Sequence, residues 1–351
     1  MSLTKFSPAL LQLDCEKEAD RIGVWLRDHL LRGFKKKGAV VGMSGGIDSS
    51  VVAALAVRAL GKERVFGLLM PERDSAGETL GLSRGLAEHL GIQYTHEDIS
   101  PILDAVGCYR RRDEAIRRAI PDYGPGCKSK IVLPSVIEDQ QRLRLFKVVV
   151  QYPDGRMAES VLNLEAYLGI VAATNFKQRT RKMLEYYHAD RLNYAVLGTP
   201  NRLEYDLGFF VKLGDGAADL KPIAHLYKTQ VYRMADFLQL PETIRGRPPT
   251  TDTYSLPQSQ EEFYFSLPYD KMDVVLYGKN KGYSAADVAP AVGLTAQQVE
   301  WVFRDIEAKR RFARYLHSPP VLVEAIHSEP NQPLPASAAK VAKAAVSSAR
   351  P

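Results

Sequence analysis

Short apolar runs and amphipathic stretches alternate along the first hundred residues. The apolar runs are continuous instead of alternating with polar positions, which is typical of strands buried on both faces of a sheet. The expected strands are residues 39–43, 65–70 and 92–96, and the expected helices are residues 11–34, 49–60 and 78–90. This order predicts an α/β fold with a doubly wound parallel sheet flanked by helices. Ligands of such sheets bind beyond the carboxyl ends of the strands.

The regular pattern breaks down between residues 101 and 162, where proline and glycine interrupt it. Within this stretch, runs at 143–152 and 156–162 flank the turn Pro153-Asp154-Gly155 and predict a β-hairpin. We interpret 101–162 as an insertion in the core. The later expected elements are helices 165–189, 228–239, 285–292 and 296–316 and a strand at 194–198. Residues 1–320 are expected to form one domain, and the Ala-, Ser-, Pro- and Lys-rich residues 321–351 a flexible tail.

Composition and charge narrow the class of protein. The chain has 351 residues, of which 45% are hydrophobic and 25% charged, as in an ordinary globular protein. Its net charge of +6 suits an anionic ligand, but the basic residues are dispersed, so no nucleic acid is expected as a partner. The three cysteines lack the spacing of a zinc or redox site. With neither a signal peptide nor a long apolar segment, we expect a cytoplasmic protein without a membrane partner.

The strongest chemical signal is the sequence G-M-S-G-G-I-D-S-S at residues 42–50, where an expected strand passes into an expected helix. Glycines there allow a tight turn, and the helix start offers N–H donors to an anion. Asp48 makes sense beside phosphates if it holds a Mg²⁺ that the phosphates share. The stretch therefore predicts a site for the pyrophosphate of a nucleoside triphosphate. The residues expected at this site are Gly42, Ser44, Gly45, Gly46, Asp48, Ser49 and Ser50.

Three other interpretations compete for these residues. An ordinary Gly-rich turn would not need the added serines and aspartate. A Walker A loop is excluded, because no Lys follows the glycines in a G-x-x-x-x-G-K-[ST] pattern. A serine hydrolase remains a weak alternative, since residues 42–46 fit G-x-S-x-G. That motif needs several strands before it in the sequence, and only one strand is expected before Ser44.

The loop at 44–49 resembles the pyrophosphate loop of the N-type ATP pyrophosphatases, whose fold is the Rossmann-like adenine nucleotide α-hydrolase type. Three later stretches resemble the NAD synthetases within that superfamily. Residues 175–181 are similar to their N-x-x-x-R-x-R segment, 197–204 to G-T-x-x-x-x-E, and 208–222 to G-F-F-T-K-Y-G-D-G-x-x-D-x-x-P. The segments 228–230 and 249–252 continue the match in order. The resemblance covers about residues 12–100 and 163–315.

This resemblance implies a ligase that joins deamido-NAD⁺ to ammonia with ATP, through an adenylated carboxylate, and releases AMP and pyrophosphate. Asp48 and Glu204 are then the two carboxylates that bind Mg²⁺, and the positively charged Lys228 lies beside the phosphates. Thr199 and Thr250 would donate hydroxyls to ATP. We expect Asp48, Lys228 and Asp215 to carry the catalysis.

The same resemblance assigns residues to the dinucleotide. Phe209 is expected to stack on the pyridine ring, and Asp215 to lie near the nicotinate end, where it positions ammonia or takes its proton. The other residues that match substrate-binding positions are Arg179, Lys212, Asp219 and Lys309. The short enzymes of the family are homodimers with deamido-NAD⁺ across the interface, so the resemblance also implies a homodimer.

The resemblance leaves the ammonia source and the acid substrate open. Only about forty residues precede the loop and no amidohydrolase domain does, so we expect free ammonia or ammonia from a separate glutaminase or amidase. The insertion and an Ala308-Lys309 pair, where the family often has His-Lys or Tyr-Lys, leave open an amide-forming ligase acting on another carboxylic acid. More distant alternatives are a tRNA-thiolating enzyme, for which no RNA-binding motif is found, and a non-catalytic nucleotide-binding protein.

Overall fold

The computed structural model describes residues 6–133, 145–248, 254–258, 264–265 and 267–324. Its centre is a parallel sheet, sheet A, with the strand order β3-β2-β1-β7. In register, Ala39 pairs with Val65 on one side and with Ala195 on the other. The strands are β1 (Ala39–Gly42), β2 (Val65–Leu69), β3 (Gln93–His96) and β7 (Ala195–Leu197). The predicted parallel sheet is confirmed, with each strand within two residues of its expected ends.

Helices cover both faces of sheet A. Because successive side chains of a strand point to opposite faces, Val41 packs with one helical layer and Val40 with the other. The first layer contains α1 (Cys15–Arg27), α2 (Ile47–Leu60), α3 (Thr79–Leu90) and α8 (Lys228–Phe237), followed by the short α9 (Glu242–Arg245). The second contains α4 (Ser100–Ala105), α5 (Cys108–Arg117) and α6 (Leu164–Leu192). The sheet is therefore doubly wound, as predicted.

The N-terminal helix differs from its prediction as one continuous helix over 11–34. A 3₁₀ turn, η1 (Pro8–Leu11), precedes α1, and α1 begins where Asp14 accepts a hydrogen bond from the Lys17 N–H. Its last turns widen into a π-helix, η2 (Asp28–Gly33). The apolar face continues from α1 into η2, because Leu26 and Leu30 are both buried.

Residues 101–162 are more regular than their sequence indicates. The expected hairpin is present as β5 (Lys147–Gln151) and β6 (Met157–Val161), and β4 (Lys128–Val132) joins it in an antiparallel sheet, sheet B. The expectation of irregular structure before it was wrong, since most of α4 and all of α5 lie there. Helix α5 was missed because most of its residues are charged. Its Ala115 and Ile116 are nevertheless buried and pack against sheet B and the start of α6.

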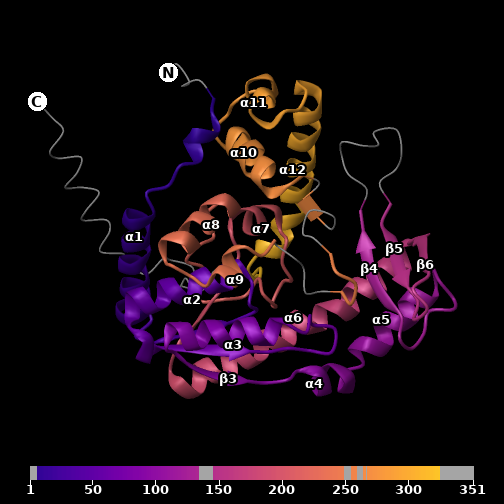
Figure 1. Ribbon diagram of the computed structural model, residues 1–351, viewed down its shortest axis with the longest axis horizontal. Coiled ribbons are helices and arrows are strands. Elements are labelled where there is room, and N and C mark those ends of the chain that lie inside the picture. The colour runs from indigo at the N-terminus through magenta and orange to yellow at the C-terminus, as the bar shows by residue number, and fades with distance from the viewer. Residues whose placement is uncertain (1–5, 134–144, 249–253, 259–263, 266, 325–351) are drawn as a thin grey trace, which may run out of the picture.

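The C-terminal part forms a second cluster of helices (Figure 1). It contains α10 (Tyr269–Asn280), α11 (Ala285–Val292) and α12 (Ala296–His317), which pack on α7 (Arg202–Leu207). Helices α11 and α12 were predicted, whereas α7 and α10 were not. Among the described residues, no helix is long and apolar enough to cross a membrane. Residues 325–351, most of the expected tail, lie outside the described residues.

Candidate functional site

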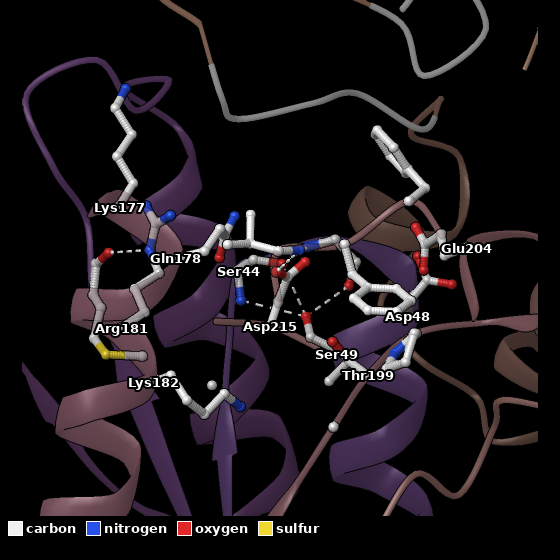
Figure 2. Close-up of a pocket in the computed structure, with 18 of the residues that line it drawn as sticks. Ser44, Asp48, Ser49, Lys177, Gln178, Arg181, Lys182, Thr199, Glu204 and Asp215 are labelled. Atoms are coloured by element: carbon white, nitrogen blue, oxygen red, sulfur yellow. Dashed lines mark hydrogen bonds between the residues drawn. The ribbon is translucent and has the colours of Figure 1, made fainter. Parts of the chain in front are cut away.

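A cavity of about 750 Å³ lies at the carboxyl ends of β1, β2 and β7 (Figure 2). Its walls come from the segment after β1, from one face of α6, and from residues 208–215 after α7. The start of α8 and the end of α12 close it. This is the position expected for a ligand of a doubly wound sheet. The cavity brings together the following residues expected at the site: Gly42, Ser44, Gly46, Asp48, Ser49, Arg179, Thr199, Glu204, Phe209, Lys212, Asp215 and Lys228.

The turn after β1 is held by its own hydroxyls. The Ser49 Oγ accepts a hydrogen bond from the Ser44 N–H at 3.3 Å, lies 3.1 Å from the Ser44 Oγ, and donates to the Gly46 carbonyl at 3.1 Å. Helix α2 starts at Ile47, so its free N–H groups and the positive end of its dipole lie at the same place. Hydroxyls and N–H groups at one point make a cradle for phosphate oxygens.

Gly45 and Ser50 support this turn from behind instead of lining the cavity. Gly45 has φ +71°, and a Cβ there would lie 3.0 Å from the Cβ of Leu82 on α3. The residue is therefore required to be glycine for both conformation and packing. The Ser50 Oγ is buried and donates to the Gly46 carbonyl at 2.7 Å. Both residues were expected at the ATP site, and neither is among the residues that line the cavity.

Lys228 and Asp48 form an ion pair inside the cavity. Lys228 is the first residue of α8 and is almost completely buried. Burial alone would lower its pKa, but the negative charges of Asp48 and Glu204 outweigh this and hold the pKa of the Lys228 amine above its ordinary value. Lys228 is therefore a permanent positive charge aimed at the turn after β1.

Asn201 joins the two carboxylates that were expected to bind metal. Its Nδ2 donates to the Asp48 Oδ1 at 3.0 Å, and its Oδ1 accepts from the Glu204 N–H at 3.2 Å. The Glu204 Oε2 in turn accepts from the Asn201 N–H at 3.0 Å, which completes the N-terminal capping box of α7. Asn201 is completely buried. The N-x-x-E spacing at the start of a helix could have identified it, but no helix was predicted there.

The donor set fits a magnesium ion that shares phosphates. Figure 2 shows the carboxylates of Asp48 and Glu204 side by side at one end of the cavity. Mg²⁺ prefers oxygen ligands and is commonly held by one or two carboxylates together with phosphate oxygens and water. Among the described residues, no cluster of three or more His, Cys, Asp or Glu could hold a metal.

The expected dinucleotide residues line the wall after α7. The Phe209 ring stacks against Tyr264 with centroids 4.8 Å apart. The Lys212 Nζ donates to the carbonyls of Tyr315 and Ser318, and the Arg179 Nε to the Lys212 carbonyl. These contacts attach the wall to α12 and α6.

Asp215 lies in the middle of the cavity in Figure 2. Its Oδ1 accepts a hydrogen bond from the Val211 N–H at 2.8 Å. Burial raises the pKa of its carboxyl, although the Val211 N–H and the charge of Lys182 partly oppose this. A carboxylate with a raised pKa is a better proton acceptor than an exposed one.

Two residues expected to bind substrate do not line the cavity. The Asp219 Oδ2 accepts from the Val196 N–H of β7 at 2.8 Å, and its Oδ1 accepts from the Tyr186 hydroxyl, so its carboxylate completes the edge of sheet A. The Lys309 Nζ donates to Asp305 and to the Tyr264 carbonyl within the C-terminal cluster. Thr250, also expected at the site, lies outside the described residues.

Helix α6 contributes buried charges that the sequence analysis missed. Lys177 pairs with Glu72 at 2.8 Å and Asp74 at 2.9 Å, and this pairing ties the loop after β2 to the helix. Lys182 and Glu185 form a second buried pair at 2.6 Å. All three α6 residues line the cavity. No local signal marks them, because a 29-residue helix contacting several elements has no single polar face.

Known proteins are similar to this chain in sequence. The family described as NAD synthase matches residues 19–119 and 153–316 and leaves 120–152 unmatched. The NH(3)-dependent NAD(+) synthetase of Rhizobium meliloti (strain 1021) is 59% identical over 321 residues, which cover 92% of this chain and 96% of that protein. The one from Thermotoga maritima is 36% identical over 283 residues, covering 80% and 92%.

Solved structures agree on the fold. The NMN synthetase from Francisella tularensis has a TM-score of 0.63 at 21% identity and covers 90% of this chain and 100% of that one. The NH3-dependent NAD synthetase from Campylobacter jejuni has a TM-score of 0.58 at 24% identity, covering 89% and 100%. The family match extends over most of the chain and includes the turn after β1, both carboxylates and the start of α8. The chain therefore belongs to the NAD synthase family.

Proposed function

We propose that this protein makes NAD⁺ from deamido-NAD⁺ and ammonia, and converts ATP to AMP and pyrophosphate. The observation that carries the proposal is the meeting of Asp48, Glu204 and Lys228 with the Ser44–Ser49 turn in one cavity that also contains an aromatic wall. A non-catalytic nucleotide-binding site would not need this set. Three relatives at 54% to 59% identity are each named NH(3)-dependent NAD(+) synthetase, which supports the same reaction.

The reaction needs the nicotinate carboxylate to be activated, because oxide is a very poor leaving group. Transfer of AMP from ATP to the carboxylate oxygen solves this, since ammonia then displaces AMP from the carbonyl carbon. The Ser44 and Ser49 hydroxyls and the α2 N-terminus bind the β- and γ-phosphates that depart as pyrophosphate. Lys228 stabilises the negative charge that grows on them in the transition state.

Asp48 and Glu204 would hold the Mg²⁺ that accompanies ATP. When bound, the ion neutralises phosphate charge and makes pyrophosphate a better leaving group. Asn201 keeps both carboxylates in place before the nucleotide binds, so little reorganisation is needed.

Phe209 and Asp215 act on the other substrate. Phe209 presents a ring face to the pyridine and holds the nicotinate near the phosphate end of the cavity. Asp215 accepts a proton from the attacking ammonia, for which its raised pKa suits it. The ammonia comes from solution or from a separate glutaminase or amidase.

We also propose a homodimer that forms through α6. Leu164 and Leu168 near the start of this helix, and Met183 and Tyr187 near its end, are each more than half exposed. Exposed apolar side chains along one long helix are typical of an interface, and a second copy of this chain is the occupant we infer. Sedimentation should give a mass near twice 39.1 kDa. A monomer at micromolar concentration would refute the dimer without affecting the reaction.

The reaction is tested by following AMP and NAD⁺ together, with ATP, Mg²⁺ and ammonium, in the presence and absence of deamido-NAD⁺. We expect equal amounts of AMP and NAD⁺, and neither without the dinucleotide. AMP without NAD⁺, or no response to deamido-NAD⁺, would refute the proposal and point to another carboxylic acid as substrate.

A further inference from the structure

Asp215 belongs to a compact turn whose two ends are joined through Val211. The Asp215 Oδ1 accepts a hydrogen bond from the Val211 N–H at 2.8 Å. The Val211 carbonyl accepts from the N–H groups of Gly214 at 2.9 Å and Gly216 at 3.1 Å. A Cβ at Gly216 would lie 2.8 Å from the Val211 carbonyl oxygen, so a larger residue does not fit there. Because the segment 211–216 is cross-linked in this way, a contact that fixes one end of it also fixes the Asp215 carboxylate.

Lys221 makes such a contact from outside the cavity. Its Nζ donates a hydrogen bond to the Gly216 carbonyl at 2.7 Å and lies 5.1 Å from the centre of the Tyr205 ring on α7. A cation at this distance from an aromatic ring is attracted to its face, so the ring also holds the amine in place. Lys221 is not among the residues that line the cavity. The lysine can therefore act on a bound substrate only through the turn that it contacts.

The backbone of Lys221 is anchored to the edge of sheet A. The preceding residue, Leu220, forms a parallel bridge with Leu197 of β7, and its carbonyl accepts from the Gly198 N–H at 2.8 Å. A Cβ at Gly198 would lie 3.1 Å from the Lys221 Cγ, so the lysine stem packs directly against the end of β7. Side chains mounted on a strand are held more precisely than those on a loop. Lys221 therefore connects a rigid part of the fold to the turn that carries Asp215.

Charge also links Lys221 to Asp215. Burial and the charge of Lys182 lower the pKa of the Lys221 amine, and the charge of Asp215 opposes this. Burial raises the pKa of the Asp215 carboxyl, while from α6 the charge of Lys182 opposes this rise and that of Glu185 adds to it. The Lys221 amine is thus close enough to interact with the Asp215 carboxyl as well as with the backbone beside it.

We infer that Lys221 is a positioning residue for the amide-forming step, which holds the Asp215 carboxylate where ammonia attacks; this inference rests on the proposed function. In that step the ammonia nitrogen bonds to the carbonyl carbon of the adenylated substrate, and AMP leaves with the electron pair of the C–O bond. One proton of the nitrogen passes to Asp215. The earlier transfer of AMP to the carboxylate moves no proton to Asp215. Loosening the turn should therefore slow the second step and spare the first.

The test compares K221M and K221R with the wild type in two assays. K221M keeps an unbranched stem but loses the donor and the charge, so kcat for NAD⁺ formation should fall roughly tenfold to hundredfold. Exchange of labelled pyrophosphate into ATP in the presence of deamido-NAD⁺, which reports the first step without ammonia, should stay at the wild-type rate and shows that the variant is folded. K221R keeps a donor and a charge and should recover most of the lost kcat.

R27M is the matched control. It removes another hydrogen bond from a long basic side chain to a distant carbonyl, that of Arg27 Nη1 to Ala59 at 3.1 Å, which joins α1 to α2. Both assays should give wild-type rates in this variant. K221Q, whose shorter side chain does not reach the Gly216 carbonyl, gives the same comparison if K221M does not fold.

Three results would overturn the positioning role while the enzyme still makes NAD⁺. The first is a wild-type kcat in the folded Lys221 variants. The second is an equal loss of NAD⁺ formation and pyrophosphate exchange, which would mean that Lys221 only supports the cavity as a whole. The third is the absence of any recovery in K221R, which would assign the loss to packing of the stem. A wild type that shows neither NAD⁺ formation nor exchange would instead refute the proposed function, and this inference with it.

Discussion

Asp273 holds the backbone of Lys228. Its two carboxylate oxygens accept hydrogen bonds from the Lys228 N–H at 3.2 Å and the Thr229 N–H at 2.7 Å, the first two donors of α8. Asp273 is completely buried on α10, so a residue of the C-terminal helical cluster positions the charged residue of the proposed phosphate site. The site and that cluster should therefore respond together to changes at Asp273.

The stability contributed by Asp273 should depend on pH. Burial raises the pKa of its carboxyl to about 6, well above the ordinary value for an aspartate, although hydrogen bonds from α8 oppose this. Between pH 5 and 7 the folded protein loses a proton that the unfolded chain has already lost, so the Asp273 contribution to stability falls as the pH rises. Relative to D273N, the wild type should lose about 1 kcal/mol of unfolding free energy over this interval.

Urea denaturation of both proteins at pH 5 and pH 7 measures this loss. Other titrating groups cancel in the difference between wild type and variant, and the lost hydrogen bond to α8 adds a constant. An identical difference at the two pH values would show that Asp273 keeps an ordinary pKa.

Replacing Asn201 with alanine should weaken metal binding more than nucleotide binding. The Asp48 Oδ1 loses its donor and α7 its N-cap, which should cost roughly 1–3 kcal/mol of stability. With the carboxylates no longer held, the Mg²⁺ concentration for half-maximal activity should rise several-fold, and Mn²⁺ binding followed by electron paramagnetic resonance should weaken in parallel. S284A, which removes the cap of α11 on the protein surface, is the matched control. Equal Mg²⁺ dependence in N201A and S284A would contradict the positioning role.

D48N should abolish turnover and leave the fold intact. It removes the negative charge that pairs with buried Lys228, so the unfolding free energy should fall by roughly 3 kcal/mol while the circular dichroism spectrum stays native. D20N, which breaks an exposed ion pair with Arg58, should alter neither activity nor stability appreciably. Substantial NAD⁺ formation by D48N would remove Asp48 from the proposed metal site.

F209A should raise the KM for deamido-NAD⁺ about tenfold and the KM for ATP much less, because the ring is proposed to stack only on pyridine. F265A is a suitable control, since Phe265 packs edge-on against Phe209 without lining the cavity. Equal increases in both KM values would assign Phe209 to packing instead of substrate binding.

Local patterns were sufficient for the core of the fold and for the position of the turn after β1. Continuous apolar runs identified the four strands of sheet A, and the glycine–serine–aspartate stretch identified the turn after β1, because both signals lie within a dozen neighbouring residues. Elements whose burial depends on distant segments were missed, because no signal within a dozen neighbouring residues marks them. Helix α5 was not expected, because charged residues dominate its sequence, and its buried side chains pack on α4, α6 and sheet B.

The roles of single polar residues were decided by packing. Asp219 and Lys309 match motif positions in the sequence, yet one completes the edge of β7 and the other pairs with Asp305, since the orientation of a side chain depends on what covers it. Asn201 and Asp273 owe their positions to partners 153 and 45 residues away. By itself the sequence determined the strands of sheet A, the turn after β1 and the chemistry of the family. Only the tertiary structure decided which charges share a buried space, because burial and hydrogen-bond partners depend on contacts between distant segments.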